Sequence, residues 1–278
     1  MARRDALKAL DTPTLIRRRD VQLVLWGDDE SGYVNDLFYV LSREMVLTTI
    51  CMPPGGSFSS SDRYRPIYDT HECLYVLQGQ YTIQNPETGE VRVADPGQMV
   101  IMREKQWHYG YNFSDVELRL LETIAPPASQ KLTAHLARPK AALGADRAAL
   151  ADWPRSRAAQ QAAMDVVDEK GALNVLLGDR EPILLRVLGS TPRASLAVIE
   201  LAAGRRSEVL RFRNDATYYV ERGRLNVRVP EDDVWQEAFP DDACFMPAGA
   251  AHQICNYGGK RCRAILSVAG NLADQLGA

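Results

Sequence analysis

The sequence has 278 residues, of which 46% are hydrophobic and 25% charged, so it can bury the core of one large domain or two ordinary ones. Its formal net charge of −3 gives no basic footprint for nucleic acid, and we expect no nucleic-acid partner. No apolar run approaches the length of a membrane span, and no apolar stretch of a signal peptide follows the basic N-terminus, so we expect no membrane partner.

The cysteines add an expectation about the cellular compartment. There are five, an odd number, and no two of them form a C-x-x-C pair. Several lie within apolar runs that resemble strands, which is typical of buried thiols in a reducing compartment. We therefore expect a cytoplasmic protein.

The first 20 residues are charged and predict one short helix, from Arg3 to Leu10, that ends before Pro13. From Val21 onward the sequence changes to short β-rich runs that turn-forming residues separate. Strands are predicted at residues 21–26, 37–41, 45–52, 74–77, 81–84, 90–94, 99–102 and 117–123. The segment 85–89 ends in glycine and predicts a tight hairpin loop.

The β pattern stops at Pro126-Pro127. Residues 128–170 are rich in Ala, Arg and Asp, with breaks at Pro139, Gly144 and Pro154, and they predict a linker of two or three short helices. Strand-like sequence returns from Ala172 and continues to Val268. The expected organisation is an N-terminal helical extension (1–20), a first β unit (21–127), a helical linker (128–170) and a second β unit (171–278).

The two β units are copies of one another. Several anchors share an offset of 144 positions: Tyr75, Val76 and Gly79 match Tyr219, Val220 and Gly223, His108 matches His252, and Asn112 matches Asn256. Upstream, Leu25-Trp26-Gly27-Asp28 matches Leu176-Leu177-Gly178-Asp179 at an offset of 151. Several matches at one constant offset indicate an internal duplication of an all-β unit, and hence a pair of barrels or sandwiches.

At these anchors the sequence resembles the cupin superfamily, and the whole chain resembles a bicupin. The second cupin motif is G-x5-P-x-G-x2-H-x3-N, and Gly97, His108 and Asn112 fall on its spacing, with Arg103 and Lys105 in place of Pro and Gly. Glu72 and Gly79 match the end of the first motif, G-x5-H-x-H-x3,4-E-x6-G. The resemblance implies an all-β fold of two cupin barrels, each a double-stranded β-helix or jelly roll, joined by the helical linker.

The metal ligands of the family transfer only in part. Metal-binding cupins use both His of H-x-H, the Glu and the second-motif His, but the H-x-H positions here hold Pro66 and Tyr68, or Arg65 and Ile67 with the longer spacer. The second copy keeps only His252, with Phe212 and Ala216 at matching places, so we expect that barrel to be metal-free.

Two readings of the first barrel stay open. In one, a divalent metal (Fe, Mn, Zn or Ni, which the sequence does not distinguish) is held by Glu72 and His108. Strand alternation favours Tyr68 over His71 as a further ligand, and His71 could join only through a bulge. In the other, no metal is bound, burial raises the pKa of Glu72, and the two groups act as general acid and base. A third alternative is a buried pair with a structural role only. Arg103 is a further candidate, placed to pair with a substrate carboxylate.

From these observations we predict a small-molecule enzyme with its site in the first barrel, around Glu72 and His108 and with Tyr68 and Arg103 as further catalytic candidates. Glu72, His108 and His71 are the candidate metal ligands. The reaction could be that of a dioxygenase, lyase, isomerase or cyclase, because cupins host all of these. The alternative is a non-catalytic, metal-free ligand-binding bicupin. We expect a homodimer, a small-molecule substrate such as an organic acid, aromatic or carbohydrate-like metabolite, and no nucleotide cofactor.

Overall fold

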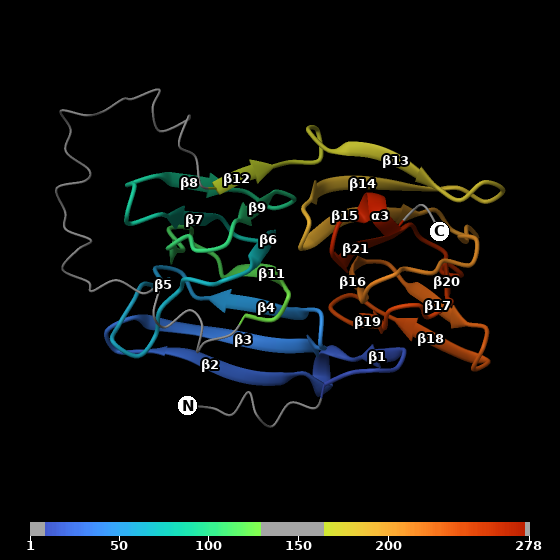
Figure 1. The fold of residues 1–278 in the computed structure, drawn as a ribbon, viewed down its shortest axis with the longest axis horizontal. Helices are drawn as coiled ribbons and strands as arrows, with labels where there is room; N and C mark the ends of the chain where they lie inside the picture. Colours follow the sequence, from blue (N-terminus) through green and yellow to red (C-terminus); the bar gives the residue numbers. More distant parts are fainter. Residues whose placement is uncertain (1–8, 129–163, 276–278) are drawn as a thin grey trace.

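The structure, a computed structural model, describes residues 9–128 and 164–275. In these ranges the regular structure is β apart from a 3-10 turn at Arg18–Asp20 and the short helix α3 at Leu272–Gln275. Two β barrels lie side by side, one from each repeat (Figure 1). The all-β expectation is therefore confirmed. The predicted helix at 3–10 falls almost wholly outside the described residues, as does most of the predicted helical linker.

The first barrel is built from two antiparallel sheets, packed around an apolar interior. Its strands are β2 (Gln22–Asp28), β3 (Gly32–Leu41), β4 (Val46–Met52), β5 (Ser57–Phe58), β6 (His71–Gln78), β7 (Tyr81–Gln84), β8 (Val91–Ala94), β9 (Met99–Met102), β10 (Tyr109–Tyr111), β11 (Leu118–Ala125) and β12 (Met164–Val167). The larger sheet has the order β12-β9-β6-β11-β4-β3-β2, and the smaller one β5-β10-β7-β8. Gly89, at φ +73°, lies in the predicted β7–β8 hairpin loop.

The second barrel repeats this plan. Its strands are β1 (Thr14–Ile16), β13 (Leu173–Leu177), β14 (Ile183–Ser190), β15 (Ala194–Leu201), β16 (Ala216–Arg222), β17 (Leu225–Val229), β18 (Val234–Ala238), β19 (Ala243–Met246), β20 (Gln253–Cys255) and β21 (Cys262–Ala269). The larger sheet has the order β1-β19-β16-β21-β15-β14-β13, and the smaller one β18-β17-β20.

The two barrels exchange edge strands. β1 precedes the first barrel in sequence but pairs with β19 of the second, where Leu15 lies opposite Cys244. β12 follows the first barrel and returns to its edge, where Asp165 lies opposite Ile101. These strands correct two expectations: β1 lies in the segment expected to be a helical extension, and β12 lies in the expected helical linker. Both are short strands whose pairing partners are distant in sequence, so the local composition did not reveal them.

The residues shared by both repeats maintain the fold. Gly79 and Gly223 adopt φ of +76° and +79°, and a Cβ at either would meet backbone atoms at 2.9 Å and 2.5 Å, respectively. Asn112 donates its amide to the Met52 and Val116 carbonyls, and Asn256 repeats the arrangement with its own neighbours. Each of these residues therefore fixes a turn or a loop, which explains why both copies keep it.

The two barrels share a buried core and a near-twofold relation. Thr123 Oγ1 lies 2.9 Å from Ser267 Oγ, its own counterpart 144 positions later, so the pseudo-twofold axis passes between them. Arg119 reaches the Tyr219 hydroxyl at 3.3 Å, and its counterpart Arg263 donates to the Tyr75 hydroxyl at 2.9 Å. The guanidinium of each arginine therefore spans the barrel interface.

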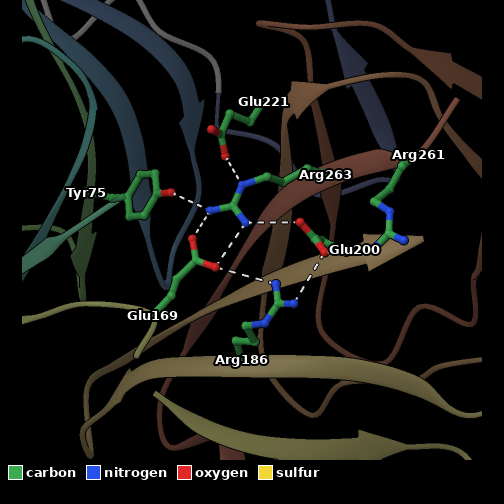
Figure 2. Close-up of polar contacts among 7 residues, drawn as sticks. All are labelled: Tyr75, Glu169, Arg186, Glu200, Glu221, Arg261 and Arg263. Atoms are coloured by element: carbon green, nitrogen blue, oxygen red, sulfur yellow. Dashed lines mark hydrogen bonds and ion pairs between the residues drawn. The ribbon is translucent and has the colours of Figure 1, made fainter. Parts of the chain in front are cut away.

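Arg263 is the centre of a charged network at this interface (Figure 2). It lies 6% exposed and also donates to Glu169, Glu200 and Glu221. Glu169 follows β12 in the chain and also pairs with Arg186 of β14 at 3.5 Å. The network therefore ties the connection between the two barrels to the second one.

Candidate functional site

A cavity of about 400 Å³, counting the space that opens to solvent, lies against the interior of the first barrel. Its ionisable lining residues are Asp36, Glu72, His108 and Glu122. Its aromatic lining residues are Trp26, Phe58, Tyr68 and Tyr81, and the remainder are Val34, Ile50, Pro66 and Leu74. This mixture of apolar walls with a few polar groups is typical of small-molecule sites.

Glu72 lies at the start of β6 and is 2% exposed. Burial raises the pKa of its carboxyl well above the ordinary value, and the neighbouring Glu122 adds to the rise through its negative charge and a hydrogen bond. Glu72 Oε2 makes no hydrogen bond within the described residues. Burial and the negative charge of Glu122 therefore both favour the protonated form of Glu72.

His108 precedes β10 and faces Glu72, with Nε2 3.6 Å from Glu72 Oε2. Burial lowers its pKa to about 4, and the Gln106 backbone raises it slightly, although Nδ1 makes no hydrogen bond of regular geometry. Its counterpart His252 resolves the tautomer, because there Nδ1 lies 2.9 Å from the Ala250 carbonyl and must donate to it. By the same arrangement, Nε2 of a neutral His108 carries the lone pair that faces the cavity.

Two cavity residues had not been anticipated from the sequence. Glu122, in β11, accepts a hydrogen bond of 2.5 Å from Thr48 and interacts with Glu72 through a hydrogen bond and through its charge. Asp36, in β3, also faces the cavity and contributes to the raised pKa of Glu72. A signal existed for Glu122, since it is a charged residue directly after Leu120-Leu121 and the second copy has Leu266 at the matching place.

The structure brings only part of the predicted set together. Tyr68 lines the cavity, its ring centroid 6.0 Å from that of His108. His71 lies outside the lining, and its Nδ1 is 3.0 Å from Thr191 Oγ1 of the second repeat. Arg103 is also outside the lining, on the surface, where it pairs with Asp165 at 3.3 Å. The placement of His71 follows from strand alternation, which turns it away from the face that carries Glu72.

The second barrel lacks this constellation. Ala216 and Leu266 occupy the places of Glu72 and Glu122, and both belong to the apolar interior. Tyr218 fills the place of Leu74, and its hydroxyl lies 2.7 Å from His252 Nε2. Since His252 Nδ1 carries the proton, the tyrosine donates this bond. The surviving histidine is thus fully hydrogen-bonded within an apolar core.

The described residues do not fit a resident metal ion. Within residues 9–128 and 164–275, no group of three or more His, Cys, Asp or Glu side chains is arranged so that it could hold one. Of the three candidate ligands, Glu72 and His108 face each other while His71 contacts Thr191.

In the described part of the chain, no helix is long and apolar enough to cross a membrane.

At the level of sequence, no protein-family model matches the chain, and no curated protein matches it. Solved structures do match. A putative glyoxylate-induced protein from Pseudomonas aeruginosa is 13% identical, with a TM-score of 0.64 over 97% of this chain and 93% of that one. A cupin 2 conserved barrel domain protein from Leptotrichia buccalis is 10% identical, with a TM-score of 0.52 over 85% and 88%. Oxalate decarboxylase from Bacillus subtilis, described with Mn(II) centres, is 12% identical, with a TM-score of 0.61 over 95% and 78%.

At these identities the likeness concerns the fold. The chain has the cupin fold in two copies, as its resemblance to the bicupins implied. Activity and ligand must be argued from the residues of the cavity itself.

Proposed function

We propose that the protein is a small-molecule enzyme that moves a proton within its substrate, as an isomerase, lyase or cyclase does, in the cavity of the first barrel. The observation that carries this proposal is the close approach of two buried groups, a carboxyl whose pKa is raised and an imidazole whose pKa is lowered. Glu72 and His108 are both at least 97% buried, and their facing atoms are 3.6 Å apart. Two titratable groups whose pKa values are shifted in opposite directions are suited to opposite roles in proton transfer.

The chemistry follows from the directions of the two pKa shifts, which favour a protonated Glu72 and a neutral His108. His108 Nε2 accepts a proton from one atom of the substrate, and Glu72 donates its proton to another atom. In an isomerisation the two transfers cancel, and in an elimination the proton from Glu72 leaves with the departing group. The resulting imidazolium and carboxylate face each other, so the proton passes back from His108 to Glu72 and restores the starting state. Tyr68, beside His108, helps to orient the substrate.

A divalent metal was one of the readings that the sequence left open, and a fold relative is described with Mn(II) centres. Among the described residues, no third His, Cys, Asp or Glu is arranged with Glu72 and His108 so that the group could hold an ion. We therefore place no step of the reaction on a metal. For the same reason we favour isomerase, lyase or cyclase chemistry over that of a metal-dependent dioxygenase.

The test uses the full-length protein in deuterated water with a panel of small metabolites, followed by mass spectrometry. Isomerisation exchanges a substrate hydrogen for deuterium, and elimination changes the product mass. We expect Glu72→Gln and His108→Asn each to reduce turnover by about 10²- to 10⁴-fold. The control His71→Asn changes a histidine outside the cavity and should retain activity.

Two outcomes would count against the proposal. If both cavity variants turn over substrate like the wild type, the active site lies elsewhere. If ligands bind but none is converted, the non-catalytic ligand-binding alternative is correct. The homodimer and the cytoplasmic location, both inferred from the sequence, remain proposals, and light scattering of the purified protein tests the first.

A further inference from the structure

Three of the four ionisable residues that line the cavity are acids, and the fourth is His108. Asp36, Glu72 and Glu122 face the cavity, and none of its lining residues is lysine or arginine. An arginine does occur near the aromatic wall: Arg63 lies over the Tyr64 ring at 5.6 Å, and Tyr64 contacts Trp26. Neither Arg63 nor Tyr64 is among the residues that line the cavity.

A second observation is independent of this charge. Glu72 Oε2 and the Tyr81 hydroxyl make no hydrogen bond within the described residues, although Glu72 is 2% exposed and Tyr81 is fully buried. Buried polar groups without partners are rare, because each one costs the free energy of its lost hydration. A carboxyl oxygen, protonated or not, and a hydroxyl oxygen both keep lone pairs that accept hydrogen bonds, so the atoms left open suit a ligand that donates to them.

The walls of the cavity add a third observation. Trp26 and Phe58 meet edge to face at 5.7 Å, and Tyr68 lines the cavity beside His108. Aromatic faces attract cations through their ring quadrupoles, most strongly where water is excluded. A positively charged nitrogen is the ligand group that suits the acids, the open acceptors and the aromatic walls together.

We propose that the ligand of this cavity carries a positively charged nitrogen, such as a protonated amine, on a small apolar or aromatic frame. The inference rests on the site of the proposed function and specifies its substrate class. A carboxylate or phosphate ligand would face three acidic side chains with no cation among the lining residues. The organic acids that we considered from the sequence are therefore disfavoured as ligands.

Matched ligands test this proposal. Benzylammonium, benzyl alcohol and benzoate share one frame and differ in charge, as do propylammonium, propanol and propanoate. Thermal shift and calorimetry with the full-length protein should show the ammonium of at least one set binding about tenfold tighter than its alcohol, with no detectable binding of the carboxylate. Glu122→Gln or Asp36→Asn should remove most of that preference. Glu117→Gln, which alters an exposed carboxylate outside the cavity, should preserve it.

The contrary outcomes are equally definite. The proposal is wrong if a carboxylate binds as tightly as the ammonium of the same set. It is also wrong if neither ammonium binds more tightly than the alcohol of its set. If Mn²⁺ or Zn²⁺ alone stabilises the protein and displaces the ammonium, the acidic groups form a metal site instead. If an ammonium compound binds but is not converted, the inference about the ligand stands and the proposed enzymatic function is wrong. If a neutral or acidic compound is converted and its conversion depends on Glu72 and His108, the proposed enzymatic function stands and the inference about the ligand is wrong.

Discussion

Replacing Glu72 by glutamine should change how the stability of the protein depends on pH. Burial raises the pKa of Glu72 above its ordinary value of 4.5. At a pH between the ordinary pKa of the unfolded chain and the raised pKa of the folded protein, Glu72 keeps its proton in the folded protein but has lost it in the unfolded chain. The free energy of unfolding of the wild type therefore falls as the pH rises through this window. Glutamine fills nearly the same space and cannot ionise, so the free energy of unfolding of the variant does not fall in this way.

The magnitude follows from linkage. One proton held by the folded state alone changes the free energy of unfolding by about 1.4 kcal/mol per pH unit. The variant should therefore gain up to about 3 kcal/mol relative to the wild type between pH 5 and pH 7, provided that the raised pKa exceeds 7. His108 titrates in both proteins, and Glu72 is not among the causes of its shift, so its contribution cancels in the difference.

The assay is urea denaturation of both proteins at half-unit steps from pH 5 to pH 8. Glu117→Gln provides the control, because it makes the same substitution at an exposed side chain. A stability difference between Glu72→Gln and the wild type that stays constant with pH would refute the reasoning. It would mean that Glu72 is ionised in the folded protein, and Glu72 could then not serve as the acid of the proposed reaction.

Three further predictions concern the metal, the interface and a turn. Elemental analysis of the purified protein should find no stoichiometric divalent ion, and an ion lost in His108→Ala would overturn the metal-free reading. Arg263→Met should lower the free energy of unfolding by about 2 kcal/mol, since it removes the charged hydrogen bonds of a buried guanidinium to the half-buried Glu169, Glu200 and Glu221. A loss below about 0.5 kcal/mol in urea denaturation would show that the network contributes little. Gly223→Ala should lower the melting temperature, because a Cβ there meets the Arg261 carbonyl at 2.5 Å at a φ of +79°. An unchanged melting temperature would contradict that role for the glycine.

Much of the fold was predictable because the strands carry their own periodicity and the repeat fixes their correspondence. β7 and β9 agree residue for residue with the predicted 81–84 and 99–102. β3 begins five residues before the predicted 37–41, because its polar first half depends on pairing with β2. β1 and β12 were missed because their pairing partners lie in distant parts of the chain.

The candidate site was predictable only where a motif pointed to it. Glu72 and His108 stand at family positions, and the structure brings their side chains together. Asp36 and Glu122 follow no motif, and only the closure of the barrel brings them to the same cavity. His71 was an uncertain candidate because sequence spacing alone does not determine whether a bulge reverses the strand alternation. The structure instead pairs it with Thr191 across the barrel interface.

Because the barrels exchange edge strands, neither barrel can close until a strand from a distant part of the sequence has been synthesised. β1 leaves the ribosome well before its partner β19, which begins only at Ala243. The nearby hydrogen bond from Arg17 to Asp242 spans 225 positions. The edge of the first barrel likewise stays open until β12 is made, well after β11. Neither repeat, cut out at its own boundaries, contains all the strands of its barrel. The nascent chain therefore completes its second barrel only after β1 has met the much later β19.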